Sequence, residues 1–325
     1  MIFLSAAETE QVADWAAVIG CLREAYGTEA APKAIPGRLV AVDKSAWLRC
    51  MPAIPATGRY MGSKQIFRTR DGKLNYLIVL FDKTEGRIAF LIDALAITAM
   101  RTAATSALAL HLLTPPGPLK LAVLGSGLEA THHVEAFAKI RKIDALAVYS
   151  PTEANRKRFA EQYQGRAAGS PQAAVEGATH VLAAARSRGE QPILHGDWLK
   201  PGMVAVSVGS THSGQREVDV SVVKRCDTIV SDVPEEVSHD TGDMIAATAA
   251  GIDFAGKIYS LADLVQARIP KERLAADTVR MFKSVGSALQ DIACAEYIAH
   301  QATARGLGTK VDFEFELKQS IGRNS

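Results

Sequence analysis

The sequence predicts an α/β protein in which an antiparallel α+β part is joined to a doubly wound parallel sheet. Residues 120–130 form an apolar strand, a Gly-x-Gly turn and the start of an amphipathic helix. Residues 39–91 instead contain short strand-like pieces separated by turn residues, a pattern typical of neighbouring hairpins. The run Thr114-Pro-Pro-Gly-Pro118 separates the two patterns. We therefore expect one domain over residues 1–115 plus about 290–325, and a second over residues 116–289.

The first domain is expected to open with one amphipathic helix over residues 9–26, where apolar residues recur at helical spacing. Five strands then follow, over residues 39–42, 47–50, 65–68, 74–81 and 87–91. An alanine-rich helix is predicted over residues 100–113, with Thr98 as its capping residue. This assignment places Arg101 in the first helical turn.

The second domain alternates strands with helices, which predicts a Rossmann-type parallel sheet with right-handed crossovers. Further apolar strands are expected over residues 145–149, 180–185, 203–208 and 228–231, and an extended piece over residues 278–282. Helices are predicted to begin at Ser150-Pro151 and Ser170-Pro171, and to span residues 259–267 and 287–305. Residues 310–317 alternate apolar and acidic side chains, so we expect a strand that returns to the first domain.

Composition narrows the classes of protein that are possible. The chain has 325 residues, of which 48% are hydrophobic and 22% charged, with a net charge of +2. No basic run suggests a nucleic-acid partner, and no apolar run in the sequence is long enough to suggest a membrane. Four cysteines are scattered without metal-ligand or disulfide spacing. We expect buried, reduced thiols, no bound metal and a cytoplasmic location.

The Gly-x-Gly turn predicts a dinucleotide site, although an ordinary strand-to-helix turn is the alternative. Gly125 would make the turn, Gly127 would leave room for a pyrophosphate, and Ala130 would let helix and strand pack closely. The intervening residues Ser126, Leu128 and Glu129 would line the same site.

The end of the next strand bears on the choice of cofactor. An NAD-preferring site would place an acid there to bind the ribose hydroxyls, but this chain has Ser150, Thr152 and Arg156. Hydroxyls and a cation suit a 2′-phosphate, so NADP(H) is favoured and NAD(H) is possible. The alternative is that residues 156–158 form only a solvated helix face.

Several motifs together resemble the ornithine cyclodeaminase/mu-crystallin family. Their order and separations fit from about residue 30 to residue 305. The resemblance implies a homodimer with the first domain's sheet at the interface, and a separate dinucleotide domain. Members include cyclodeaminases, amino-acid dehydrogenases, ketimine reductases and a hormone-binding crystallin. The motifs are Met51-Pro-Ala53, Gly62-Ser-Lys64, Arg101-Thr-Ala-Ala104, the Gly125 turn, Val208-Gly-Ser-Thr-His212 and Phe282-Lys-Ser-Val-Gly286.

The resemblance also implies roles for individual residues. Arg101 and Lys64 match residues that hold the substrate carboxylate, and Lys64 could also exchange a proton if burial lowers its pKa. Arg38 matches an earlier carboxylate-binding arginine of the family. Relatives are longer over residues 70–76 and carry a His-Gln-like pair there, for which Asn75 is the one plausible substitute. The residues implied to lie beside the nicotinamide are Val208, Gly209, Ser284 and Gly286. For the last two, a plain strand-to-helix turn is an equal alternative.

One position departs from the cyclodeaminase pattern. In cyclodeaminases the block over residues 208–212 looks like Gly-Gly-Asp, and its aspartate binds the side-chain amine of the substrate. Thr211 stands at the position of that aspartate. A hydroxyl cannot offer a negative charge to a substrate ammonium. His212 could supply a proton to an imine nitrogen, or it could be an ordinary surface histidine. Asp232, Glu235 and Glu236 follow a strand. A carboxylate there could meet a substrate amine near the cofactor cleft, but a solvated acidic loop is the expected state.

These observations favour NAD(P)H-dependent reduction of a small imino acid or ketimine to the L-amino acid. The enzymatic alternatives are an L-amino-acid dehydrogenase and an ornithine or lysine cyclodeaminase. The non-enzymatic alternative is a protein that binds a small ligand together with NADPH.

Overall fold

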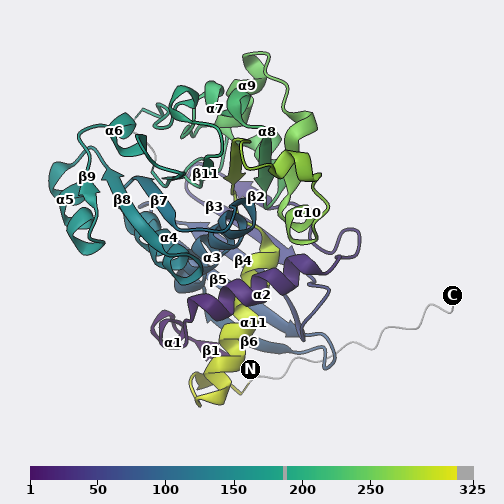
Figure 1. Ribbon diagram of the computed structural model, residues 1–325. Coiled ribbons are helices and arrows are strands. Elements are labelled where there is room, and N and C mark those ends of the chain that lie inside the picture. Colours follow the sequence, from purple (N-terminus) through teal and green to yellow (C-terminus); the bar gives the residue numbers. More distant parts are fainter. Residues whose placement is uncertain (186–188, 313–325) are drawn as a thin grey trace.

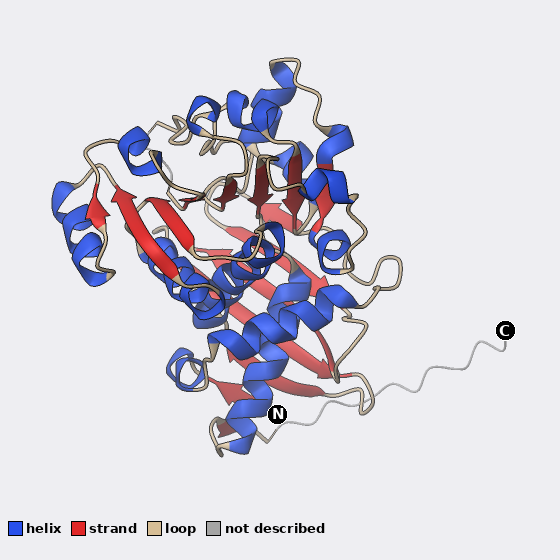
Figure 2. Cartoon of the chain, in the orientation of Figure 1, coloured by secondary structure: helices blue, strands red, loops and turns tan. Residues whose placement is uncertain are grey.

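The computed structural model describes residues 1–185 and 189–312, and within them the strands form two sheets (Figure 1). Helices α2 (Trp15–Gly27) and α11 (Ala288–Ala304) lie across one face of the first sheet, as Figure 2 shows. The second sheet lies beyond α3 (Leu95–Leu113), which contacts strands of both sheets. This confirms the α/β class with one mixed and one parallel sheet.

The first sheet has the order β15-β1-β6-β5-β4-β3-β2. The strands from β2 to β6 pair antiparallel with their chain neighbours, as predicted. Parallel pairing of β1 with β6 makes the sheet mixed. The strands are β1 (Ile2–Leu4), β2 (Leu39–Val42), β3 (Trp47–Ala53), β4 (Tyr60–Arg68), β5 (Leu74–Asp82), β6 (Ile88–Asp93) and β15 (Thr309–Lys310).

Strand β15 pairs antiparallel with β1, so the chain returns to the first sheet as its sequence predicted. The predicted strand over residues 310–317 extends past residue 312, and its remainder lies outside the described residues.

Two helices replace the single opening helix that the sequence predicted. Helix α1 (Ala6–Gln11) begins with a capping box between Ser5 and Glu8. Helix α2 begins at a second cap, because the Asp14 carboxylate accepts a hydrogen bond of 2.7 Å from the backbone N–H of Ala17. An aspartate followed by helical periodicity marks such a start, so the second cap was readable in the sequence.

Helix α3 begins at Leu95, not at Met100 as predicted. Thr98 lies inside the helix, where its N–H donates to the carbonyl of Ala94 at 2.8 Å. The N-cap residue Ala94 makes no side-chain capping bond, and the Asp93 carboxylate instead accepts from the N–H of Leu95 at 3.1 Å. Arg101 therefore lies in the second turn, and its predicted place in the first turn is wrong.

Helix α3 is long and apolar enough to cross a membrane, but 61% of its apolar window is buried in the protein. The helix ends at Leu113, just before the Pro-Pro-Gly-Pro run, as predicted. Two arginines of the second domain bind the carbonyls there: Arg280 binds that of Leu113 at 2.7 Å, and Arg141 binds that of Thr114 at 2.9 Å. These bonds connect the two parts of the chain.

The second sheet is parallel throughout, with the order β13-β12-β14-β11-β10-β7-β8-β9. The strand order reverses between β7 and β10. In such sheets ligands bind at this reversal, beyond the carboxyl ends of the strands. The strands are β7 (Leu119–Leu124), β8 (Ile143–Tyr149), β9 (Arg166–Ala167), β10 (His180–Ala183), β11 (Val204–Ser207), β12 (Thr228–Ser231), β13 (Ile258–Ser260) and β14 (Arg280–Lys283).

Helices flank the parallel sheet on both sides (Figure 1). The predicted start at Ser170 is confirmed, since its hydroxyl accepts from the N–H of Ala173. The predicted helix over 259–267 is instead β13 followed by a short helix that Ser260 caps. The helices are α4 (Leu128–Ile140), α5 (Glu153–Gln162), α6 (Pro171–Val175), α7 (Val220–Arg225), α8 (Pro234–Asp240), α9 (Gly242–Ala249) and α10 (Leu261–Val265), with short 3₁₀ turns at Gly196–Trp198, Ala255–Lys257 and Lys271–Leu274.

Candidate active site

The Gly125 turn lies where the strand order of the parallel sheet reverses. Gly125 has φ +125°, and a Cβ there would lie 2.8 Å from the Ala184 carbonyl oxygen, so glycine is needed. Gly127 is the N-cap of α4 and has open space where a Cβ would stand. No side chain caps this helix end, so its first N–H groups can receive a phosphate. The turn therefore fits a dinucleotide.

The other residues of the turn divide between core and surface. Ala130 is fully buried, as close packing of helix on strand requires. Leu128 is 68% exposed at the start of the helix. The Glu129 side chain is 50% exposed, and partial desolvation raises the pKa of its carboxyl although the positive charge of Arg101 opposes this.

The residues predicted for the adenosine end lie together. Ser126 donates to the Ser150 hydroxyl at 2.9 Å, and Arg156 donates to the Ser150 carbonyl at 3.1 Å. Helix α5 is capped at Thr152, so the predicted start at Ser150-Pro151 is two residues too early. The Ser150 hydroxyl is engaged with Ser126 and with the Thr152 carbonyl, and so does not cap the helix.

A buried carboxylate that the sequence did not single out binds the backbone of the loop after β11 at Gly209. Glu217 accepts hydrogen bonds from the N–H groups of Gly209 and Ala185, at 2.9 and 3.1 Å, and from the Ser207 hydroxyl at 2.6 Å. It thereby ties the loop after β11 to the loop after β10. Burial raises the pKa of the Glu217 carboxyl to about 7, although the nearby Lys283 ammonium opposes this.

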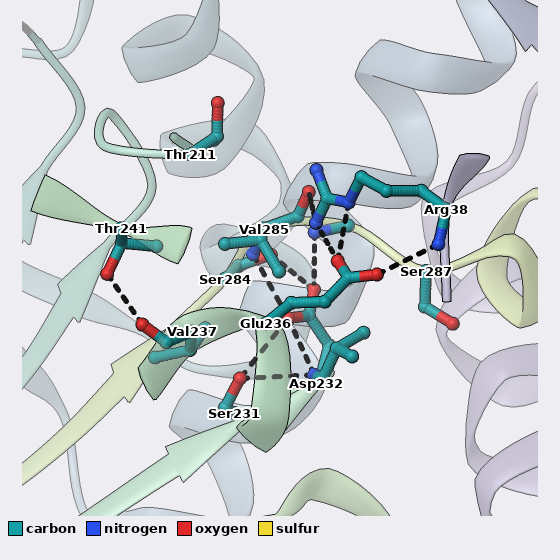
Figure 3. Close-up of polar contacts among 12 residues, drawn as sticks. Arg38, Thr211, Ser231, Asp232, Glu236, Val237, Thr241, Ser284, Val285 and Ser287 are labelled. Carbon is teal, nitrogen blue, oxygen red and sulfur yellow. Dashed lines mark hydrogen bonds and ion pairs between the residues drawn. The ribbon is translucent and has the colours of Figure 1, made fainter. Parts of the chain in front are cut away.

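The loop that carries Ser284 and Gly286 is held by Asp232 (Figure 3). The Asp232 carboxylate accepts from the Ser284 hydroxyl at 2.6 Å and from the N–H groups of Val285 and Gly286 at 3.0 and 2.8 Å. It is 8% exposed, so the predicted solvated acidic loop is wrong at this residue. Because β12 and β14 are neighbours, the end of β12 reaches the loop after β14.

Lys64 and Arg101 meet on one carboxylate. Asp291 lies in the first turn of α11, and its Oδ1 accepts from Lys64 Nζ at 2.6 Å and from Arg101 Nε at 2.9 Å. The side chains of Lys64 and Asp291 are completely buried, and that of Arg101 is 8% exposed. The other oxygen, Asp291 Oδ2, is buried without a hydrogen-bond partner among the described residues.

Burial lowers the pKa of Lys64 to about 7. Asp291 opposes this shift, whereas the positive charges of Arg101 and Arg49 add to it. The family resemblance implies that this lysine exchanges a proton, and that role stays a prediction.

Gln290 connects the two halves of the site. Its side-chain oxygen accepts from Arg101 Nη1 at 2.8 Å, and its amide nitrogen donates to Asp232 at 3.1 Å and to the Tyr26 hydroxyl at 2.9 Å. Gly286 adds a steric contact, since a Cβ there would lie 2.7 Å from Arg101 Nη1. The loop predicted to face the nicotinamide is thus in direct contact with the arginine predicted to bind substrate.

Arg38 lies at the edge of this cluster, paired with Glu236 of α8 (Figure 3). Its Nη2 also lies 3.5 Å from the Val285 carbonyl oxygen. The Arg38 side chain is 9% exposed and that of Glu236 is 12% exposed, so Glu236 is not the solvated acid that the sequence suggested.

Three predicted residues remain apart from the Lys64 cluster. Thr211 gives both its N–H and its hydroxyl to Gln215 Oε1, at 2.9 and 3.1 Å, and has no drawn contact with the other residues of Figure 3. His212 is exposed, and its Nδ1 accepts from Gly214 N–H at 3.2 Å. Asn75 pairs with Phe67, whereas Lys64 pairs with Ile78. Because successive side chains of a strand alternate between faces, Asn75 points to the opposite face of the sheet from Lys64.

Sequence reasoning missed Asp291, Gln290 and Glu217, and it wrongly expected Asp232 to lie in a solvated loop. An acid in a first helical turn ordinarily complements the helix dipole, so Asp291 carried no distinct signal. The described residues contain no group of three or more His, Cys, Asp and Glu that could hold a metal ion. All four cysteines are free, and two of them, Cys21 and Cys50, are only half-buried, contrary to expectation.

Comparison with known proteins identifies the family of this chain. The sequence profile of the Ornithine cyclodeaminase/mu-crystallin family matches residues 1–306. Ketimine reductase mu-crystallin of Macropus fuliginosus is 32% identical over 224 residues, covering 68% of this chain and 67% of that protein.

Two solved structures are similar over nearly the whole chain. Thermococcus litoralis Δ(1)-pyrroline-2-carboxylate reductase, in complex with NADH and L-proline, has a TM-score of 0.85 and 25% identity, covering 96% of this chain and all of the other. An archaeal alanine dehydrogenase dimer with bound NAD has a TM-score of 0.87 and 20% identity, covering 97% and 99%. The protein therefore belongs to the ornithine cyclodeaminase/mu-crystallin family.

Proposed function

We propose that the protein is an NAD(P)H-dependent reductase that converts a small imino acid to the L-amino acid. The observation that carries this proposal is the buried pairing of Lys64 and Arg101 on Asp291, in contact with the Gly286 loop. Two cations on one carboxylate leave a positive charge for a substrate carboxylate. The ketimine reductase and pyrroline-2-carboxylate reductase relatives support the choice of reaction.

The reaction consumes one imine, one reduced cofactor and one proton, and it yields the amino acid and the oxidised cofactor. A bound nicotinamide cofactor supplies the hydride. Arg101 and Lys64 bind and orient the substrate carboxylate, which brings the imine carbon into a fixed position. Lys64 then gives its proton to the imine nitrogen, because its lowered pKa makes it a sufficiently strong acid near pH 7.

The reverse direction, oxidation of an L-amino acid, is the second candidate. A lysine with a pKa of about 7 is as able to accept a proton from an amine as to donate one. Cyclodeamination is less well supported, since Thr211 offers no negative charge and its hydroxyl is bound to Gln215. Product analysis separates these reactions: ammonia and a cyclic amino acid from ornithine, with no net turnover of cofactor, would contradict the reductase.

For the cofactor we favour NADP(H), with NAD(H) possible. Arg156 stands beside the end of β8, no acid occurs over residues 149–152, and the guanidinium makes hydrogen bonds only through Nη1 among the described residues. Its remaining N–H groups can therefore receive a 2′-phosphate.

We also propose a homodimer formed through the uncovered face of the first sheet. Helices cover the face that carries Lys64, where Ile78 and Leu80 are fully buried. The opposite face presents Val79 and Phe81, which stay partly exposed in a central strand. An apolar sheet face of this kind is typical of a subunit interface, and the archaeal alanine dehydrogenase relative is a dimer.

The carboxylate clamp is tested by replacing Arg101. The Arg101→Ala variant should lose at least about a hundredfold in kcat/KM for imine reduction, because an interaction worth about 3 kcal/mol in the transition state is removed. The dissociation constant for NADPH, measured by fluorescence titration, should change less than about threefold. Arg268→Ala removes a surface arginine as the control. Unchanged turnover in Arg101→Ala would refute the clamp.

The proton donor is tested by the pH profile. Lys64 is charged below its pKa of about 7 and neutral above it, so kcat/KM for reduction should fall about tenfold per pH unit above pH 7. In Lys64→Arg the cation persists but cannot release a proton, so the rate should be low and this limb should disappear. A wild-type profile that stays flat from pH 6 to pH 9 assigns the proton to another group.

The cofactor preference is tested at Arg156. In Arg156→Ala the KM for NADPH should rise about tenfold, which corresponds to about 1.4 kcal/mol, while the KM for NADH stays within about twofold. Lys157→Ala is the matched control, because it removes a cation from the same helix that pairs with the exposed Glu153. Equal effects on the two cofactors in Arg156→Ala would contradict a 2′-phosphate contact.

The dimer is tested by placing a charge on the uncovered face. We expect Val79→Lys to halve the mass measured by sedimentation velocity, because a twofold axis would bring two buried charges into the interface. Leu74→Lys places the same charge on the same strand but on the opposite face, and should leave the mass unchanged. A wild-type protein that sediments as a monomer at micromolar concentration rules out this interface.

A further inference from the structure

Arg49 lies on the same face of the first sheet as Lys64. Met51 pairs with Lys64 across β3 and β4, and Arg49 is two residues before Met51 on the same strand. Residues two apart on a strand share a face. Arg49 itself pairs with Ile66, so Arg49 and Lys64 are diagonal neighbours, about 7–8 Å apart. The arginine therefore belongs to the surroundings of the substrate clamp.

Arg49 has no anionic partner among the described residues. Its Nε is buried without a hydrogen-bond acceptor. The contact recorded for its guanidinium is with the Trp47 ring, 4.9 Å from the ring centroid. A buried N–H group without an acceptor destabilises the folded protein, because it has lost its hydrogen bonds to water. The guanidinium packs on the Trp47 ring, and its Nε has no acceptor among the residues that the structure describes.

Nearby positive charges make the burial of the Arg49 guanidinium without an anion more unfavourable. Burial lowers the pKa of Arg49 to about 10, and the positive charges of Arg38 and Arg101 add to that shift. The carboxylate that acts against it is Glu236. Glu236 is already paired with Arg38 (Figure 3). Arg49 thus lies near two other cations, and the nearby carboxylate of Glu236 is already paired with Arg38.

The carboxylate clamp of Lys64 and Arg101 and the guanidinium of Arg49 would each bind a separate anion. Asp291 balances one of the two charges of Lys64 and Arg101, so the α-carboxylate of an imino acid balances the other. A substrate with a single carboxylate would leave Arg49 without a partner. A second carboxylate on the substrate side chain would satisfy the guanidinium through two parallel hydrogen bonds, the arrangement that suits arginine best.

We propose that Arg49 binds a second carboxylate of the substrate, and that the substrate class is the dicarboxylic imino acids. This rests on the proposed reductase function and assigns its side-chain specificity. Arg49 is a specificity-determining residue and takes no part in hydride or proton transfer. The reaction remains balanced as above, with the second carboxylate unchanged.

The test compares imines that form in solution from ammonium and an oxo acid. Oxaloacetate and 2-oxoglutarate provide dicarboxylic imines, and pyruvate and 2-oxobutanoate provide monocarboxylic ones. With the full-length protein and NADPH or NADH, the wild type should favour the dicarboxylic set at least tenfold in kcat/KM. In Arg49→Gln the value for the dicarboxylic set should fall at least thirtyfold, mainly through KM. The fall for the monocarboxylic set should be at least ten times smaller.

Two further variants separate charge from fold. Arg49→Lys keeps a positive charge and should retain part of the preference. Arg68→Gln removes an exposed arginine from the adjacent strand β4, on the same face, and should retain all of it. A preference that survives Arg49→Gln, or a wild type that reduces both sets equally well, overturns the inference and leaves the reductase function standing.

A binding measurement decides the case in which no imine is reduced, which would contradict the reductase function itself. Succinate should then raise the melting temperature of the protein–NADPH complex more than propionate does, and Arg49→Gln should remove the difference. Equal shifts in the wild type overturn the inference. Dissociation of the dimer in Arg49→Gln with an unchanged substrate preference would place Arg49 at the subunit interface and also overturn it.

Discussion

The Asp291 carboxylate is the contact on which the rest of the site depends. It receives Lys64 from the first sheet and Arg101 from α3, and all three side chains are buried. Removing one partner of a buried ion pair commonly costs about 3–5 kcal/mol, because the remaining charge has no water to solvate it. The positions of β4, α3 and α11 are therefore coupled to the position of one carboxylate.

The path of the chain explains how this carboxylate comes to lie between two sheets. The first sheet is built from the N-terminal strands, and the parallel sheet follows it. Helix α11 then begins directly after the Gly286 loop and runs back across the first sheet (Figure 1). Its first turn thus stands at the junction, where Gln290 reaches Asp232 and Asp291 reaches Lys64. One helical turn contacts both the predicted cofactor side and the predicted substrate side.

The parts of the fold with local signals could be predicted from the sequence. Gly125 has a positive φ, which a glycine at the end of an apolar strand signals locally, and the cap at Ser287 lies three residues from its partner Gln290. The start of α3 could not be predicted, because the N-cap residue Ala94 has no side chain that can cap a helix. Thr98, by contrast, is of a residue type that commonly caps helices, although it lies inside this one. Periodicity describes a segment well, but it does not locate an end without a capping group.

The site itself depends on pairs that are distant in the sequence. Lys64 and Asp291 are separated by 227 residues, and Arg38 and Glu236 by 198. Neither member of such a pair shows its partner by spacing. The family resemblance supplied the cations because their motifs are short and ordered, whereas Asp291 and Asp232 resemble ordinary acids near helix and strand ends. Their roles became visible only with the sheet registers.

Burial, more than pairing, sets the state of Lys64. Asp291 raises its pKa, yet desolvation and the neighbouring arginines lower it to about 7. A substrate carboxylate brought against Lys64 adds a negative charge and so raises the pKa again. Binding of the substrate would therefore draw a proton onto the lysine before the hydride arrives, and the lysine would pass that proton to the imine nitrogen. The substrate carboxylate that the clamp would bind thus also favours the protonated lysine that the reduction consumes.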